Sequence, residues 1–123
     1  MSADDLQIAR QFGSALEGAA KTGDWTAVYP LLAADVEWVT PKRTLTGIDE
    51  LEHDRIWGDP PEHLDLDFEV GDWVDLGDGR AAIDVRQVYR MKDSGDFAYQ
   101  RDLHIEVVIR GSAIARYEIR PTP

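Results

Sequence analysis

The sequence contains no cysteine. Disulfide bonds, thiol nucleophiles and cysteine-bound metals are therefore excluded. It also lacks any apolar run near the roughly 20 residues that a membrane-spanning helix needs. The opening segment, MSADDLQIAR, carries neither the basic nor the apolar stretch of a secretory signal peptide. These absences predict a soluble protein, and we expect it to be cytoplasmic.

Positive charge is scarce. The chain has 13 Lys and Arg residues against 24 Asp and Glu residues, which gives a formal net charge of −11 at pH 7. Nucleic acids and anionic membranes bind proteins through positive charge, so we expect neither as a partner.

Several motifs of enzyme chemistry are missing as well. There is no glycine-rich phosphate-binding loop and no GxSxG nucleophile motif. The histidines at 53, 63 and 104 do not have the spacing of metal ligands, although His104 could hold a metal ion together with Asp102 and Glu106. We therefore expect no cofactor and no metal.

The residues that are present suit one globular domain over residues 1–123, with 43% hydrophobic and 30% charged residues. The first half predicts helices. After the first helix, a short helical segment is predicted over 25–34, and Pro30 predicts a kink or a 3₁₀ finish in it. A brief strand is predicted over 36–40, and a third helix over 48–57. A first helix, ending at Gly23, has apolar residues at helical spacing on one face: Leu6, Ile8, Ala9, Phe12, Ala15, Leu16 and Ala19.

From residue 63 onward the apolar period becomes two, which is typical of strands. Leu64, Leu66, Phe68 and Val70 alternate with acidic residues, which predicts a half-buried strand with an acidic outer side. Turn signals around residues 77–79, 93–96 and 111–112 separate further strands at about 80–92, 97–110 and 113–120. Helices followed by an antiparallel meander predict an α+β fold.

Two-residue turns at 78–79, 94–95 and 111–112 would set the pairing of these strands. In that register Val85 faces His104, Gln87 faces Asp102, and Glu106 faces Tyr117. One face of the sheet then mixes the apolar row of the first strand with a polar group made of Gln87, Tyr89, Gln100, Asp102, His104, Glu106 and Tyr117. Buried polar side chains must either satisfy one another or line a wet or ligand-filled cavity. A slip of one residue in any turn would exchange the faces.

The order of these features resembles a known family. The chain has paired helices, the segment GDW, the segment LLAADVEWVTP, a helix after a TG turn and a terminal four-strand meander. This pattern resembles the NTF2-like superfamily over essentially the whole chain, and within it the SnoaL-like and ketosteroid-isomerase-like branch. The resemblance implies an α+β cone (cystatin-like), with N-terminal helices packed on a curved antiparallel sheet around a mostly apolar pocket. It also implies a small hydrophobic ligand or substrate and a homodimer formed through the outer sheet face, where Trp73 would suit a contact.

Two specific activities of the family lack their residues. Steroid isomerases place a carboxylate base just after the first strand, where this chain has residues 38–40 and no base. Their first-helix tyrosine matches Phe12, which has no hydroxyl, and their protonated acid matches His104 or Glu106. In the epoxide hydrolases of this fold, an arginine and two aspartates match Val85, Gln87 and Ile119, so that triad is absent. The resemblance therefore implies neither a typical ketosteroid isomerase nor a limonene-type epoxide hydrolase.

The predicted catalytic residues are His104 and Glu106, with Asp102 as a further partner. His104 and Glu106 are two residues apart on a strand, so they point the same way at a separation of about 7 Å. A histidine beside a carboxylate in an apolar cavity can act as an acid or a base near neutral pH. The alternative is a buried pair that hydrogen-bonds with Tyr117 and fixes the strand register.

The predicted ligand-binding residues are those expected to line the pocket or its mouth: Tyr117, Gln87, Tyr89, Gln100, Trp38, His53, Trp57 and Phe12. Their alternatives are ordinary packing for the aromatic residues and, for His53, a surface histidine beside a half-buried tryptophan at i and i+4.

Three functions follow from this pattern. The first is a small hydrophobic molecule-binding protein that acts as a cofactor-free acid–base enzyme of the isomerase, cyclase or lyase type. The second is a non-catalytic small-molecule binding protein with the same pocket. The third is a dimeric interaction module whose pocket is filled by its own side chains.

Overall fold

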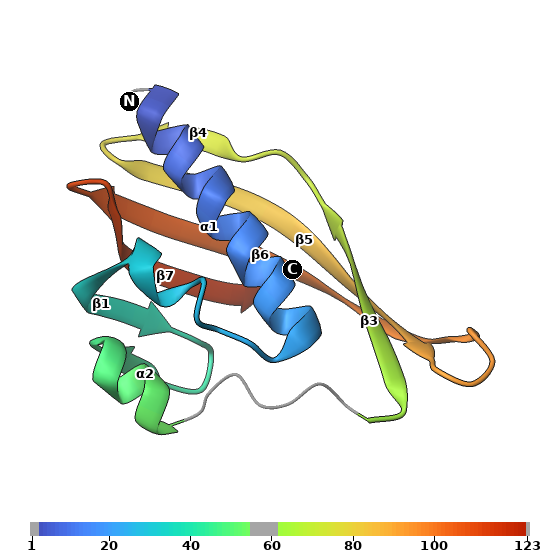
Figure 1. Ribbon diagram of the computed structural model, residues 1–123. Coiled ribbons are helices and arrows are strands. Elements are labelled where there is room, and N and C mark those ends of the chain that lie inside the picture. The colour runs from blue at the N-terminus through green and yellow to red at the C-terminus, as the bar shows by residue number, and fades with distance from the viewer. Residues whose placement is uncertain (1–2, 55–61, 123) are drawn as a thin grey trace.

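A curved sheet with a long helix across its inner face makes up most of residues 3–54 and 62–122, the part of the chain that the computed structural model describes (Figure 1). The α+β class predicted from the sequence is confirmed. The described elements, in chain order, are α1 (Ala3–Thr22), the 3₁₀ turn η1 (Tyr29–Leu31), β1 (Leu32–Val39), β2 (Thr44–Thr46), α2 (Ile48–Asp54), β3 (Leu64–Val70), β4 (Val74–Gly77), β5 (Arg80–Met91), β6 (Phe97–Arg110) and β7 (Ala113–Pro121).

The helix α1 forms as its apolar spacing predicts. Its buried residues Ala9, Phe12 and Ala19 lie on one face, because residues three and four apart share a side of a helix. Gly23 ends it in the left-handed conformation (φ 79°), and the Gly23 amide donates to the carbonyl of Ala19 at 2.7 Å. No described helix is long and apolar enough to cross a membrane.

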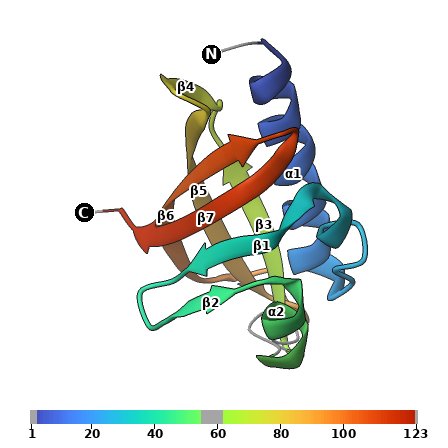
Figure 2. The ribbon, with the colours of Figure 1, turned by 90° about the vertical axis from the view of Figure 1, so that its left-hand side faces the viewer.

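The sheet has the strand order β2-β1-β7-β6-β5-β3, and β4 also pairs with β5. β3, β5, β6 and β7 form the predicted antiparallel meander. β1 instead runs parallel to β7, so the curved sheet is mixed and only its meander is antiparallel. Figure 2 shows the strong curvature of the sheet, with the β1–β2 hairpin and the end of β7 projecting together on the side away from α1.

The region between the helices differs from the sequence prediction in two details. The 3₁₀ turn at Pro30 is present, but β1 starts directly after it, at Leu32 instead of Val36. The short strand β2, with Leu45 opposite Trp38, was not predicted because three residues are too few to show a period. α2 runs from Ile48 to Asp54, and the remainder of the predicted helix, residues 55–57, lies outside the described residues.

The predicted register is wrong for β6. The observed partners are Val85 with Leu103, Arg86 with Asp102, and Asp84 with His104. On the other side of β6, Val107 pairs with Tyr117, and Glu106 pairs with Glu118. The face of the sheet that packs on α1, here called the inner face, therefore receives the apolar row of β6, which is Leu103, Ile105, Val107 and Ile109.

Two β-bulges cause this exchange of faces. The turn at 111–112 is as predicted, with Arg110 opposite Ala113, but Ala115 is an extra residue in β7 and shifts the later pairs by one. At the other end of β6, Ala98 is an extra residue between the Tyr89–Tyr99 and Arg90–Phe97 pairs. Each bulge turns the side chains beyond it to the opposite face, because side chains alternate along a strand.

The predicted orientation of the side chains of β3 is confirmed, whereas that of Trp73 is wrong. The acidic residues Asp65, Asp67 and Glu69 of β3 pair with outward-facing positions of β5, as their alternation with the apolar row predicts. Trp73, predicted on the outer face as a dimer contact, instead packs on α1: a Cβ added at Gly13 would lie 3.0 Å from its Nε1. This prediction is wrong because Trp73 lies in the segment between β3 and β4, outside the strand alternation on which it rested.

Candidate functional site

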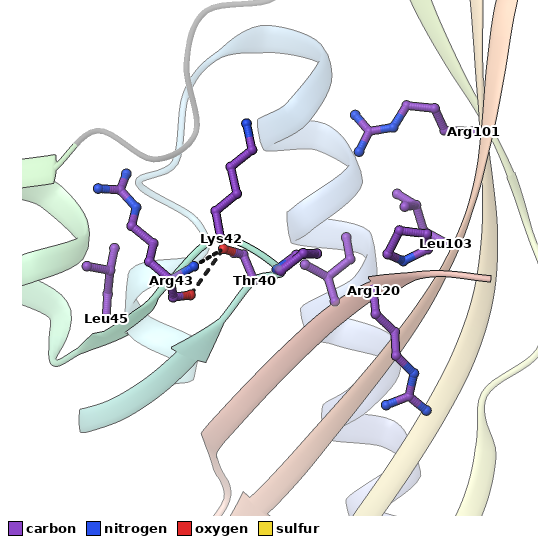
Figure 3. A pocket seen from close by; sticks show the side chains of 10 residues that line it. Thr40, Lys42, Arg43, Leu45, Arg101, Leu103 and Arg120 are labelled. Carbon is purple, nitrogen blue, oxygen red and sulfur yellow. Dashed lines mark hydrogen bonds between the residues drawn. The ribbon is translucent and has the colours of Figure 1, made fainter. Parts of the chain in front are cut away.

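A pocket with a volume of about 460 Å³ opens where the β1–β2 hairpin faces the start of β6 and the end of β7 (Figure 3). This volume lies within the range typical of small-molecule sites. The described residues that line it are Thr40, Pro41, Lys42, Arg43, Leu45, Arg101, Leu103, Ile119, Arg120 and Pro121.

The floor of this pocket is apolar. Leu45 and Leu103 are buried and Ile119 is half-buried, and the three come from three different strands. They share the inner face because the bulges in β6 and β7 bring Leu103 and Ile119 to the same side as Trp38 and Leu45. The apolar floor of the pocket therefore depends on the register of β6 and β7.

The rim of this pocket is basic. Lys42 and Arg43 lie on the hairpin loop, which the amide of Thr40 closes by donating to the carbonyl of Arg43 at 2.9 Å. The Thr40 hydroxyl donates to the same carbonyl at 3.1 Å, and Figure 3 draws the hydrogen bonds between Thr40 and Arg43 as dashed lines. Arg101 comes from the opposite wall, two residues before Leu103 on the inner face of β6. None of the described lining residues is acidic.

The fourth cation, Arg120, is engaged elsewhere. Its Nη2 lies 3.3 Å from Glu106 Oε2, and its Nη1 lies 3.9 Å from Glu118 Oε2. Figure 3 shows its guanidinium directed away from Lys42, Arg43 and Arg101. Arg120 therefore lines the pocket with the aliphatic part of its side chain, while its guanidinium contacts Glu106 and Glu118 on the outer face.

Three predicted ligand-binding residues form an aromatic cluster under α1. The ring centroids of Trp38 and Tyr117 are 3.8 Å apart and the rings are stacked, and Phe12 meets both rings edge-on. All three are buried, and burial raises the pKa of the Tyr117 phenol. None of them lines the pocket. The three side chains therefore pack against one another in the interior of the fold. Ordinary packing was the alternative to ligand binding that the sequence left open for these aromatic residues.

The predicted catalytic pair lies on the outer face of the sheet. The two side chains point the same way, as predicted, and His104 Nε2 is 3.6 Å from Glu106 Oε2, closer than expected. Their predicted position on one face with Tyr117 is wrong, because the bulge at Ala115 places Glu118 opposite Glu106. His104 Nδ1 lies 2.9 Å from Asp84 Oδ1 instead.

Glu106 is the centre of this outer network. Arg80 donates to Glu106 Oε1 at 3.0 Å and Arg120 donates to Oε2 at 3.3 Å. The hydrogen bond from Arg80, supported by the charges of Arg80, Arg120 and His104, lowers the pKa of Glu106 against an opposing contribution from burial. Glu106 is therefore held as a carboxylate. A catalytic role for His104, Glu106 or Asp102 stays a prediction.

Asp102 likewise has an outer-face partner. The Nε of Arg86 donates to Asp102 Oδ1 at 2.8 Å, and both side chains are about half exposed. The predicted partner, Gln87, is on the inner face opposite Arg101. Across the described residues, no group of three histidine, aspartate or glutamate side chains is placed to hold a metal ion.

The remaining predicted ligand-binding residues are spread over the molecule. Gln87 and Tyr89 are on the inner face as predicted, and Tyr89 stacks on Tyr99 with ring centroids 4.4 Å apart. Burial raises the pKa of the Tyr89 phenol, and the positive charge of Arg101 opposes that shift. Gln100 is on the outer face, contrary to the prediction, and His53 is exposed on α2. Trp57 lies outside the described residues.

The three basic residues of the rim were missed by the sequence analysis. Because side chains alternate along a strand, the predicted register that placed Gln100 and Asp102 on the inner face placed Arg101 on the outer one. This error has the same cause as that for His104, since both residues follow the bulge at Ala98. For Lys42 and Arg43 a signal was present: two adjacent bases follow Thr40 and Pro41 in a strongly acidic chain.

No family model and no curated protein sequence matches this chain. Solved structures match it along nearly its whole length. An NTF2-like protein from Anabaena variabilis matches with a TM-score of 0.76 and 14% identity, over 100% of this chain and 93% of that one. TerC, co-crystallised with polyporic acid, matches with a TM-score of 0.71 and 14% identity, over 98% and 92% of the two chains.

A third similar structure, described as a SnoaL-like polyketide cyclase from Mesorhizobium loti, has a TM-score of 0.65 and 16% identity, over 93% of this chain and 96% of that one. The similar structures are thus NTF2-like, ketosteroid-isomerase-like and SnoaL-like proteins, in agreement with the resemblance found in the sequence. The chain has the NTF2-like fold, an α+β cone with a curved, open sheet.

Proposed function

We propose that this protein binds a small, largely apolar molecule in the pocket between the β1–β2 hairpin and the ends of β6 and β7. The observation that carries the proposal is the apolar floor of Leu45, Leu103 and Ile119 beneath a polar rim, in a volume suited to a small ligand. A site of this composition binds through apolar contact and uses its few polar groups for orientation.

Binding is better supported than acid–base catalysis. A general acid or base must come within hydrogen-bond reach of the substrate. The described lining residues include no histidine, aspartate or glutamate. His104 and Glu106, the predicted acid–base pair, lie on the other face of the sheet. Of the functions that the sequence predicts, we therefore propose the non-catalytic small-molecule binding protein.

The third predicted function, an interaction module with a self-filled pocket, accounts for only part of the interior. Phe12, Trp38 and Tyr117 occupy the space beneath α1, but the pocket beyond them keeps about 460 Å³. TerC, which has a similar fold, was co-crystallised with polyporic acid, so this fold can accommodate a small organic molecule. That support is an analogy of fold.

The proposal is tested by screening aromatic fragments against the protein with ¹³C-labelled methyl groups. We expect binders to shift the methyl signals of Leu45, Leu103 and Ile119 more than other methyl signals, because these residues form the pocket floor. Ile119→Trp should abolish these shifts by filling the pocket. Val74→Trp, which adds the same ring at an exposed position of β4, should leave them unchanged.

Two results would contradict the proposal. The first is a fragment library that shifts none of the three floor methyl signals at millimolar concentration. The second is binding that persists in Ile119→Trp while thermal unfolding shows that variant to be folded.

A further inference from the structure

We propose that Glu106 is a positioning residue of this pocket: it holds the guanidinium of Arg120 on the outer face, so that the aliphatic part of Arg120 forms a fixed wall. The inference rests on the proposed binding function and adds how one wall of that site keeps its shape. Glu106 is not among the described residues that line the pocket, so its part in binding runs through Arg120.

Arg120 lies at a place where the strand pairing changes. The last pair of β1 with β7 in the described structure is Val39 with Glu118, whereas β7 stays paired with β6 as far as Pro121. Arg120 therefore has β6 on one side and lines the pocket on the other. Its side chain is 49% exposed, and a long side chain with that much space can adopt many rotamers unless other groups hold its end.

Two carboxylates hold the guanidinium of Arg120. Its Nη2 lies 3.3 Å from Glu106 Oε2, and its Nη1 lies 3.9 Å from Glu118 Oε2. Each carboxylate is itself fixed at its other oxygen, since Arg80 donates to Glu106 Oε1 at 3.0 Å and Arg116 donates to Glu118 Oε1 at 3.1 Å. Ion pairs joined in a network hold a geometry better than isolated surface pairs do. The end of Arg120 is therefore fixed on the outer face.

Glu106 is the stronger of the two holders. Its oxygen is the closer one to Arg120, and its side chain is 21% exposed against 28% for Glu118. The hydrogen bond from Arg80 lowers the pKa of Glu106, which keeps it charged at neutral pH. Figure 3 shows the result at the pocket: the guanidinium of Arg120 is directed away from the other labelled cations.

A wall that is ordered in advance favours binding. A ligand that packs on a mobile side chain must immobilise it, and the lost rotamer freedom weakens binding. For one long side chain this loss corresponds to a dissociation constant about threefold to tenfold higher. The outer-face network thus removes this cost, because Arg120 is held before any ligand arrives.

The test titrates the protein with 2-naphthamide at pH 7 and follows the methyl signals of Leu45, Leu103 and Ile119. We expect Glu106→Gln to raise the dissociation constant about threefold to tenfold, because the ligand must then order the side chain of Arg120. The probe is uncharged, so its binding does not respond to the accompanying change in net charge.

Glu37→Gln is the matched control. Glu37 is on the outer face of β1, opposite Arg116, and its Oε2 lies 4.0 Å from the Nε of that arginine. The substitution is the same, it removes the same charge, and it also takes a carboxylate from an arginine of β7. Because Arg116 does not line the pocket, the dissociation constant should change by less than twofold.

A second variant tests whether the effect runs through Arg120. Arg120→Met keeps an aliphatic wall but has no guanidinium to hold, so it should bind 2-naphthamide within about twofold of the natural protein. In that background Glu106→Gln should have no further effect. A double-mutant cycle of this kind separates positioning through Arg120 from a general loss of stability, which would persist in the Arg120→Met background.

A measurement on the natural protein alone completes the test. ¹⁵N relaxation of the Arg120 Nε group should give an order parameter above about 0.6, the upper limit for flexible groups. A lower value would overturn the inference even if the variants failed to fold, because the side chain would then not be held.

The other outcomes separate this inference from the proposed function. An unchanged dissociation constant in Glu106→Gln, an equal rise in Glu37→Gln, or an equal effect of Glu106→Gln in the Arg120→Met background would overturn the positioning role and leave the apolar pocket standing. Loss of binding in Arg120→Met would also overturn it, because the guanidinium would then make the contact. No shift of the floor methyl signals at millimolar 2-naphthamide would overturn both.

Discussion

The two faces of β6 hold their side chains by different physical means. On the outer face, charges lie in pairs: Glu106 contacts Arg80 and Arg120, and Asp102 contacts Arg86. On the inner face, the row of β6 beyond Arg101 is apolar and packs with the aromatic cluster. Arg101 itself, at the open end of that row, is the exception. The comparison teaches that the charges of the outer face are held by one another, whereas the inner face is held by apolar and aromatic packing.

The inner face should dominate stability. Phe12 has no exposed surface and meets Trp38 and Tyr117 edge-on. We expect Phe12→Ala to lower the free energy of unfolding by about 3–5 kcal/mol, the cost of a large cavity in a core. Urea unfolding followed by tryptophan fluorescence measures this change. Val74→Ala, at an exposed position, is the control and should cost little. A loss for Phe12→Ala below about 1 kcal/mol would mean that the cluster does not form the core.

The outer face should contribute less, and its contribution should depend on pH. The hydrogen bond from Arg80 lowers the pKa of Glu106 in the folded protein. The unfolded value is about 4.3. The stabilisation by Glu106 is therefore fully present above that pH and is lost as the pH falls through the lower folded value.

We expect Glu106→Gln to cost about 1 kcal/mol at pH 7, because the partners of Glu106 are partly exposed. The difference between the variant and the natural protein should be smaller at pH 3 than at pH 7, because the stabilisation is lost as the pH falls below the unfolded pKa and through the lower folded pKa of Glu106. Urea unfolding at the two pH values measures both quantities. A difference that stays constant between pH 7 and pH 3 would show that the effect of the substitution does not come from the charge of Glu106.

The smallest expected effect concerns self-association. The homodimer through the outer face stays a prediction, and light scattering after gel filtration tests it by measuring mass. If two copies pack there, Arg116→Gln should weaken the dimer by less than about tenfold, since exposed ion pairs such as that of Arg116 with Glu118 contribute little. A mass of one chain at all concentrations would contradict the dimer, and an equal effect of Ile119→Trp, on the inner face, would place the contact elsewhere.

Much of the fold could be predicted because it is encoded locally. The apolar spacing of α1, Gly23 at its end, the alternation in β3 and the turn at 111–112 are each a short-range signal, and each is confirmed. The register of β6 could not be obtained from turn lengths, because the extra residues Ala98 and Ala115 interrupt the count. The alternation within β6 places its apolar row on the core side without any assumption about turns.

The candidate site was harder to predict for the same reason. The apolar floor of the pocket and Arg101 lie on the same face only because of the two bulges, which determine the side to which the side chains of β6 and β7 point. Lys42 and Arg43 line the pocket from a hairpin whose second strand has only three residues. No single segment carries the pattern. What the sequence did offer was the unusual adjacency of two bases after Thr40 in an acidic chain.

The bulge at Ala115 also determines which changes of length this chain tolerates. Removing that one residue would restore an uninterrupted ladder and turn the remainder of β7 over, so that Tyr117 and Ile119 would exchange sides with Arg116 and Glu118. The pocket floor and the aromatic cluster would be lost in the same step. Whether an odd or an even number of residues is gained or lost in β7 therefore matters more than which small side chain stands at the bulge. Insertions and deletions of odd length should be far more damaging than substitutions at Ala115.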